Sequence, residues 1–154
     1  MTAHTVVAEG EGRFAAQEHR DLTIGLAHIS ETVERSCELT SDQLWARLHH
    51  ALGWLEHELR PHFAWEDTWL YPQLDLIAGT PWATRGARFE HRQIETLIAA
   101  LESDSARWLG HSTSRTNAEV VAHLSAIRAV IAAHAEREER LLLPLLDERE
   151  TPPG

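Results

Sequence analysis

Residues 59–76 read LRPHFAWEDTWLYPQLDL, and residues 131–148 read IAAHAEREERLLLPLLDE. An offset of 72 residues relates the two stretches. Both contain a histidine, a glutamate four residues later and a proline six residues after the glutamate, so that His62 and Glu66 correspond to His134 and Glu138. The sequence therefore contains an internal repeat, and the two long stretches are predicted to be equivalent elements of its two halves.

The repeat extends outward from these stretches. Glu18-His19-Arg20 recurs as Glu90-His91-Arg92, again 72 residues later. Apolar residues with helical spacing match as well, in the pairs Leu22 and Ile94, Leu26 and Ile98, Leu52 and Leu124, and Leu55 and Ile127. Each half is thus predicted to be a hairpin of two amphipathic helices.

The spacing predicts four long helices, at about 11–38, 42–76, 81–109 and 116–148. Thr40 with Gln43 and Thr116 with Glu119 have the spacing of capping boxes, and Thr80 precedes Pro81 as a predicted N-cap. Pro61 lies inside the second helix and predicts a kink. The fold class is all-α, an up-down-up-down four-helix bundle formed by residues 11–148. Residues 1–10 are predicted to be flexible and residues 149–154 disordered.

The composition excludes several classes of protein. The chain has 154 residues, a formal net charge of −10, eleven histidines and a single cysteine, Cys37. Such an acidic chain is not expected to bind nucleic acid or an anionic membrane surface. One cysteine allows no internal disulfide and no thiolate zinc site. No signal peptide or membrane segment is recognisable, so we expect a cytoplasmic protein.

All four helices are predicted to point one histidine at the bundle axis. His62 follows the apolar stripe of its helix at a spacing of three, and His134 occupies the equivalent place, while His19 and His91 each precede an apolar position by three. Glu66, like its repeat partner, continues the same buried face. Unpaired buried carboxylates are unfavourable, and a bound metal cluster removes that cost. Imidazoles and carboxylates on facing helices indicate a non-haem di-iron or di-manganese centre.

These residues resemble the hemerythrin-like family, also called HHE cation-binding domains, over about residues 14–148. The family pattern is a histidine on helix one, H-x-x-x-E on helix two, a histidine on helix three and H-x-x-x-E/D on helix four. The resemblance implies two non-haem iron ions, with manganese as the alternative, and an oxo or hydroxo bridge. It implies the ligands His19, His62, Glu66, His91, His134 and Glu138, with both glutamates bridging.

Helix three departs from the oxygen carriers of this family, which have H-x-x-x-H there. The second position is Glu95 in this chain. We expect Glu95 to reach the metal, and an anionic ligand of this kind to favour ferric iron and redox turnover over reversible oxygen storage. A solvated or orienting role is the alternative for Glu95.

The predicted function is accordingly catalase-like reaction with hydrogen peroxide, or reaction with O2 or NO. The alternatives are a non-enzymatic sensor or carrier of O2, NO or iron, and a metal-free bundle that acts through a protein partner. A hydrogen-bonded polar layer is the alternative to a metal site. We expect a monomer or weak homodimer.

The remaining polar and aromatic residues are predicted to have ordinary roles. Seven histidines are expected at the surface, with His123 also able to line one end of the bundle. Asp67 and Glu139 are predicted to be solvated rather than to orient the ligands. Tyr71 and the neighbouring tryptophans are expected to be core packing. The seven surface histidines are His4, His28, His49, His50, His57, His111 and His123.

Overall fold

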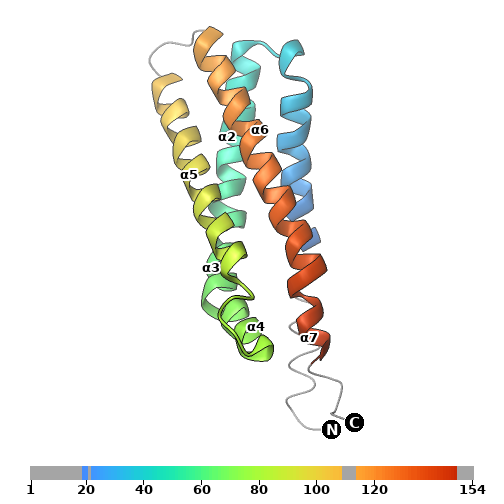
Figure 1. Ribbon diagram of the computed structural model, residues 1–154. Coiled ribbons are helices and arrows are strands. Elements are labelled where there is room, and N and C mark those ends of the chain that lie inside the picture. The colour runs from blue at the N-terminus through green and yellow to red at the C-terminus, as the bar shows by residue number, and fades with distance from the viewer. Residues whose placement is uncertain (1–18, 21, 109–113, 149–154) are drawn as a thin grey trace.

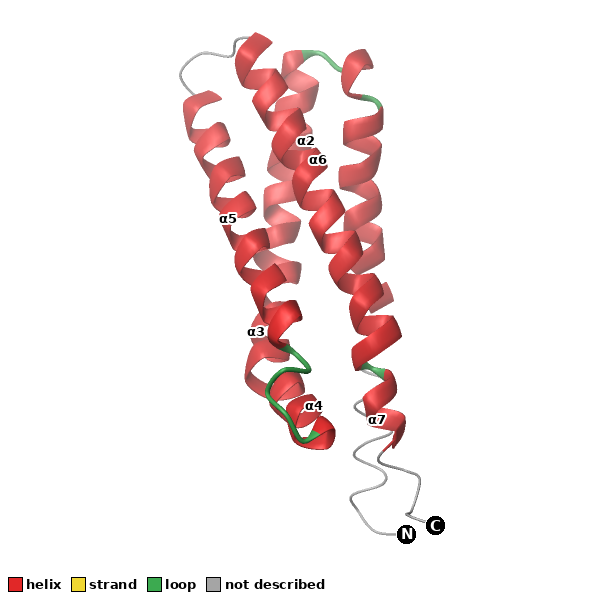
Figure 2. Cartoon of the chain, viewed as in Figure 1, coloured by secondary structure: helices red, strands yellow, loops and turns green. Residues whose placement is uncertain are grey.

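Four long helical rods lie side by side in the computed structural model, and successive rods run in opposite directions (Figure 1). The structure describes residues 19–20, 22–108 and 114–148. The predicted flexible N-terminus, the start of the first helix, most of the break at 110–114 and the tail at 149–154 lie outside these ranges. Within them every regular element is a helix (Figure 2). The predicted all-α bundle is confirmed.

The first rod is helix 22–34, which ends in the short 3-10 helix η1 (Ser36–Glu38). The second rod comprises α2 (Ser41–Trp54), η2 (Leu55–Leu59), α3 (Arg60–Trp65), η3 (Glu66–Leu70) and α4 (Tyr71–Ala78) without interruption. The third rod is α5 (Arg85–Trp108). The fourth comprises α6 (Ser114–Arg137), η4 (Glu138–Leu142) and α7 (Pro144–Glu148).

The predicted capping box at Thr40 is present, since its hydroxyl accepts from the Gln43 N–H and the Gln43 side chain accepts from the Thr40 N–H. The other two predicted helix starts are wrong. Helix α5 begins four residues after Pro81, because the Thr84 N–H and hydroxyl both bind the Asp75 carboxylate and fix the chain there. Thr116 lies inside α6 rather than at its start.

The elements η2, η3 and η4 are single turns of π-helix, and each lies just before a proline. In each case the residue preceding the proline donates its N–H five residues back, at the pairs Arg60 to Leu55, Tyr71 to Glu66, and Leu143 to Glu138. A proline has no N–H and its ring collides with the carbonyl four residues earlier, so a widened turn accommodates it within a continuous helix. Two of these turns begin at Glu66 and Glu138, the repeated glutamates.

The core has two apolar parts. The larger one is formed by residues from all four rods, including Ile29, Leu48, Ile98 and Leu124. Gly25 belongs to this region, because a Cβ there would overlap the indole of Trp54. The smaller part is formed by Leu70, Tyr71, Leu74, Ala87 and Leu142. The repeated histidines and glutamates lie between these two parts along the second and fourth rods.

One helical stretch, Arg115–Asp147, is long and apolar enough to cross a membrane by length and composition. A core helix of a bundle passes the same test, and the inner face of this helix carries Val120, Leu124, Ile127 and Ile131, all buried against the other rods. We therefore assign it to the core of the bundle.

Candidate metal centre

Six of the seven predicted ligands come together in the interior of the bundle. They form two groups of four buried residues, and within each group one ligand atom per residue lies within 4.8 Å of the others. One group contains His19 and His62, and the other contains His91 and His134. Glu66 and Glu138 belong to both groups. The arrangement is therefore one cluster with two histidine pairs and two shared carboxylates.

The local helix geometry places these side chains. His62 ends up one turn before Glu66, and His134 one turn before Glu138, so that the histidine and glutamate of each pair project from the same face. The His62 Nε2 atom lies 3.3 Å from Glu66 Oε1, and His134 Nε2 lies 3.1 Å from Glu138 Oε1. Both glutamates begin a π turn, so the wide turn follows directly after each buried carboxylate.

The Nε2 atoms of all four histidines lie beside the shared carboxylates. His19 Nε2 is 2.7 Å from Glu138 Oε2, on the side opposite to His134. His91 Nε2 is 3.3 Å from Glu66 Oε1 and 3.2 Å from His134 Nε2. Glu138 thus spans from one histidine pair to the other through its two oxygens. A carboxylate that uses both oxygens in this way is suited to bridge two cations.

The Nδ1 atoms of three of these histidines lie near a second set of carboxylates. His91 Nδ1 is 3.1 Å from both oxygens of Asp67, and His19 Nδ1 is 3.5 Å from Glu139. Asp67 is only partly exposed and contacts a histidine of the other hairpin, which differs from its predicted solvated role, whereas Glu139 is solvated as predicted, with its side chain 62% exposed. An acceptor at Nδ1 fixes the ring and leaves Nε2 free for a metal.

Glu90 is the third such carboxylate, and the sequence reasoning did not single it out. It is buried, its Oε2 lies 3.5 Å from His134 Nδ1, and it forms an ion pair with Arg137. Its place next to His91 within the repeated Glu-His-Arg segment was the signal available in the sequence. The same repeat relates Asp67 to Glu139.

Two buried carboxylates, those of Glu66 and Glu138, dominate the electrostatics of the cluster. Burial alone would raise the pKa of Glu66, but the close approach of Glu138 and of three histidines outweighs it and holds that pKa well below the usual value. Burial would lower the pKa of His134, yet the two carboxylates raise it to about 9. The same carboxylates raise the pKa of His19. Without a metal, protons on histidine therefore balance the glutamates.

The cluster passes a chemical test for cation binding. Neither oxygen of Glu66 has a hydrogen-bond partner among the described residues, although both are fully buried. No arginine or lysine contacts Glu66 or Glu138 in the described part of the chain. Imidazole nitrogens and carboxylate oxygens without a competing side-chain cation suit a transition metal.

The sequence predicted Tyr71 to be a core-packing residue only. In the structure its hydroxyl also belongs to the cluster. Its side chain is fully buried, and its hydroxyl donates to Glu138 Oε1 and lies 3.2 Å from His91 Nε2. Burial and the two nearby glutamates raise its pKa, so the phenol keeps its proton and remains a donor. No spacing in the sequence indicated this contact.

Glu95 is the predicted ligand that the structure does not bring into the cluster. Its side chain is 46% exposed, and it accepts hydrogen bonds from Arg60 at 3.0–3.2 Å. The buried face of α5 runs from His91 to Ile94 and Ile98, which leaves Glu95 at the edge of that face, opposite α3. We therefore leave Glu95 out of the ligand set.

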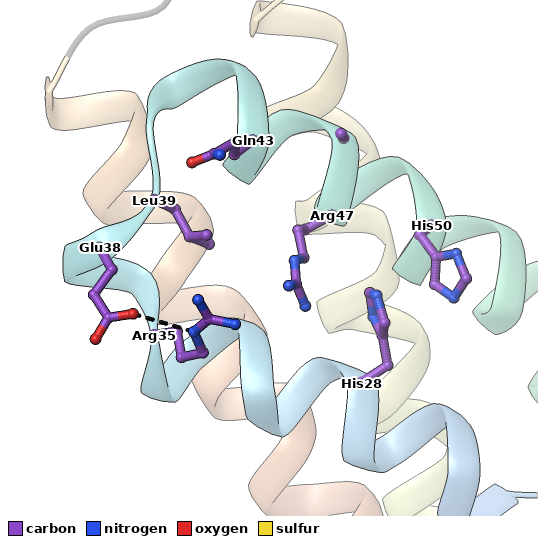
Figure 3. Close-up of a pocket in the computed structure, with 8 residues that line it drawn as sticks. His28, Arg35, Glu38, Leu39, Gln43, Arg47 and His50 are labelled. Carbon is purple, nitrogen blue, oxygen red and sulfur yellow. Dashed lines mark hydrogen bonds and ion pairs between the residues drawn. The ribbon is translucent and has the colours of Figure 1, made fainter.

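Other histidines lie away from the cluster. His28 is half-buried and its ring lies tilted against that of His50 with 4.0 Å between centroids, in a pocket of about 450 Å³ between helix 22–34 and α2 (Figure 3). His123 does lie toward one end of the bundle, where its Nδ1 is 2.5 Å from the fully buried Asp104. Asp104 also pairs with Arg107, so this second acid–histidine cluster is already balanced.

Comparison with known protein families gives one match. The model of the family described as Hemerythrin HHE cation binding domain matches residues 13–146. That range contains all six clustered residues. Neither the curated proteins nor the solved structures that were compared include a match.

Proposed function

The chain belongs to the hemerythrin HHE cation-binding family, and from this premise we propose that it holds two iron ions and reacts with hydrogen peroxide. The single observation that carries the proposal is the sharing of Glu66 and Glu138 between two groups of buried ligands. One ion would need only one of the two histidine pairs, whereas two ions would use both pairs and share the two carboxylates.

The assignment of residues follows from the two groups. His19 and His62 would hold one ion, and His91 and His134 the other, with the two glutamates bridging. Iron fits this mixed imidazole and carboxylate set, whereas calcium and magnesium prefer oxygen ligands alone. Manganese has similar preferences and is the alternative metal.

A pair of iron ions held by these residues would supply two electrons, which is the number needed to reduce one hydrogen peroxide to two waters. A second hydrogen peroxide, oxidised to O2, would return those two electrons. Two hydrogen peroxide molecules then give one O2 and two waters, with protons balanced and no other electron donor. Because this reaction needs no other electron donor, we favour peroxide over substrates that require a separate reductant.

The surrounding residues would keep the centre dry and accessible to small molecules only. The Phe63 ring stacks on His91 with 3.9 Å between centroids, and it covers the cluster on the side of the larger apolar core. A pocket of about 340 Å³ reaches the outer edge of His91, between Asp67, Arg88 and Arg92. Its size supports approach of a small molecule to this side of the cluster.

The test begins with protein produced in iron-supplemented medium, in which iron per chain, absorbance and O2 evolution after peroxide addition are measured. We expect two iron ions per chain and sustained O2 evolution. Asp104→Asn is the matched control, because it alters the other buried acid–histidine cluster and should leave both readings unchanged.

Other outcomes discriminate between the alternatives. Bound iron with one stoichiometric absorbance change and no turnover would refute catalysis and favour a sensor or carrier of O2, NO or iron. Protein that contains no transition metal after supplementation with iron and with manganese would refute the metal centre itself.

A further inference from the structure

The internal repeat makes the cluster nearly symmetric, and Tyr71 breaks that symmetry. The offset of 72 residues relates His19, His62 and Glu66 to His91, His134 and Glu138, so that each clustered residue of one half has a like residue in the other. It also relates Leu70 to Leu142 and Pro72 to Pro144, but between them it pairs Tyr71 with Leu143. One half therefore carries a phenol where the other carries an aliphatic side chain.

The phenol contacts only one side of the cluster. Its hydroxyl donates to Glu138 Oε1, the oxygen that lies 3.1 Å from His134, and it is 3.2 Å from His91. The other oxygen, Glu138 Oε2, lies beside His19. The donor is thus on the side of the pair His91 and His134.

Leu143 provides no equivalent donor for Glu66. It packs with the smaller apolar core, and both oxygens of Glu66 lack a hydrogen-bond partner among the residues that the structure describes. The two shared carboxylates are consequently alike in position but different in hydrogen bonding.

We propose that Tyr71 is a positioning residue that makes the two metal positions inequivalent, with the position at His91 and His134 the one prepared to take an exogenous ligand. The proposal rests on the proposed dinuclear centre. A carboxylate oxygen that accepts a strong hydrogen bond donates less charge to a cation. The ion on the Tyr71 side is then the more electron-poor of the two, and it binds a small anion or peroxide more readily.

The location of the pocket agrees with this direction. The pocket of about 340 Å³ has His91 in its wall and is lined by two arginines and two carboxylates, namely Arg88, Arg92, Asp67 and Glu95. A small anion that enters there meets the side of the cluster on which the phenol lies. The pocket and the Tyr71 hydroxyl therefore both favour the metal position at His91 and His134.

The experiment uses protein loaded with ⁵⁷Fe, and Mössbauer spectroscopy as the readout. We expect two doublets of equal area in the unaltered protein, and a reduced difference between their quadrupole splittings in Tyr71→Phe. The affinity of the loaded protein for azide, followed by absorbance, should fall about tenfold in the same variant. Glu102→Gln is the control, since its side chain binds Arg60 at the surface and lines neither the cluster nor this pocket.

A second measurement remains informative if Tyr71→Phe does not fold or does not bind iron. Tyr71 is the only tyrosine in the chain, so incorporation of 3-fluorotyrosine labels this position alone. The single ¹⁹F resonance should shift on titration with zinc, and mainly during one of the two equivalents.

Each outcome bears on a separate claim. Identical doublets in the unaltered protein, doublets unchanged by Tyr71→Phe, or a ¹⁹F resonance that zinc does not move would overturn the role of Tyr71. Failure of the unaltered protein to bind two metal ions would instead refute the dinuclear centre on which this proposal rests.

Discussion

Two clusters of buried acids beside histidines lie in the described part of the bundle, and only one of them is suited to a metal. In the cluster of α5 and α6, Asp104 meets one histidine and one arginine, so its charge is matched by side chains alone. In the other cluster, Glu66 and Glu138 meet four histidines and no arginine. Buried carboxylates beside histidines are therefore not a sufficient sign of a metal site. What separates the two clusters is whether the acid is neutralised by an arginine, which keeps its proton, or by histidines, which can exchange theirs for a metal.

The largest expected effect comes from removal of a shared carboxylate. Glu138→Ala takes one ligand from both groups at once, so metal affinity should fall by at least ~100-fold, the upper end of the effect of losing an outer partner. Equilibrium dialysis against Fe(II) without oxygen measures it. Retention of both ions by this variant would show that Glu138 does not bridge.

The other cluster should respond in the opposite way. Asp104→Asn removes a buried carboxylate whose partners, His123 and Arg107, are exposed enough to be hydrated, so the free energy of unfolding should fall only modestly. Metal content should be unchanged. Urea denaturation and metal analysis on the same sample check both statements, and a loss of metal would erase the distinction between the clusters.

The metal-free protein should become less stable as the pH rises. The pKa of His134 is raised to about 9 in the folded state, from an ordinary value of 6.5. The stabilisation is therefore fully present below pH 6.5 and is lost as the pH rises through 9, by at most about 3 kcal/mol. Metal-loaded protein should lack this loss, because the metal replaces the proton. A flat profile of unfolding free energy between these pH values in metal-free protein would contradict the account.

The outer carboxylates should have smaller effects. Asp67→Asn weakens the acceptor at His91 Nδ1, so metal affinity should fall about 10-fold. Glu139→Gln should have less effect, since Glu139 is more exposed and lies 3.5 Å from His19. Metal titrations of the two variants in parallel test the order, and a larger effect of Glu139→Gln would reverse it.

The smallest effect is expected at Glu95. Because Glu95 binds Arg60 at the edge of α5, Glu95→Gln should leave metal affinity and stoichiometry unchanged. Calorimetric titration with Fe(II) is sensitive enough to detect a lost ligand. A clear decrease would restore Glu95 to the ligand set and show that its side chain rotates inward when metal binds.

The sequence was sufficient to predict the bundle and the six clustered residues, because the repeat places them on apolar stripes in both halves. It failed where geometry depends on contacts between rods. Glu95 has the spacing of a ligand, but the buried face of α5 passes beside it and Arg60 lies within reach. The start of α5 depends on Asp75, which is nine residues before Thr84 and belongs to another helix.

The role of Tyr71 could not be predicted for a related reason. Its neighbours in the sequence are apolar, so its position indicates packing, and its hydroxyl reaches a glutamate 67 residues away. The π turn at 66–70 changes the direction of the side chains that follow it, and periodicity at 3.6 residues does not anticipate such a turn. The contact of Asp67 with His91 was similarly missed, because His91 belongs to the other hairpin.

The most direct test of the central claim is an anomalous difference map from crystals of the iron-loaded protein, recorded at the iron absorption edge. The account predicts two peaks, one between the Nε2 atoms of His19 and His62 and one between those of His91 and His134, with Glu66 and Glu138 contacting both. A single peak, or peaks only at the surface or beside Asp104, would contradict it.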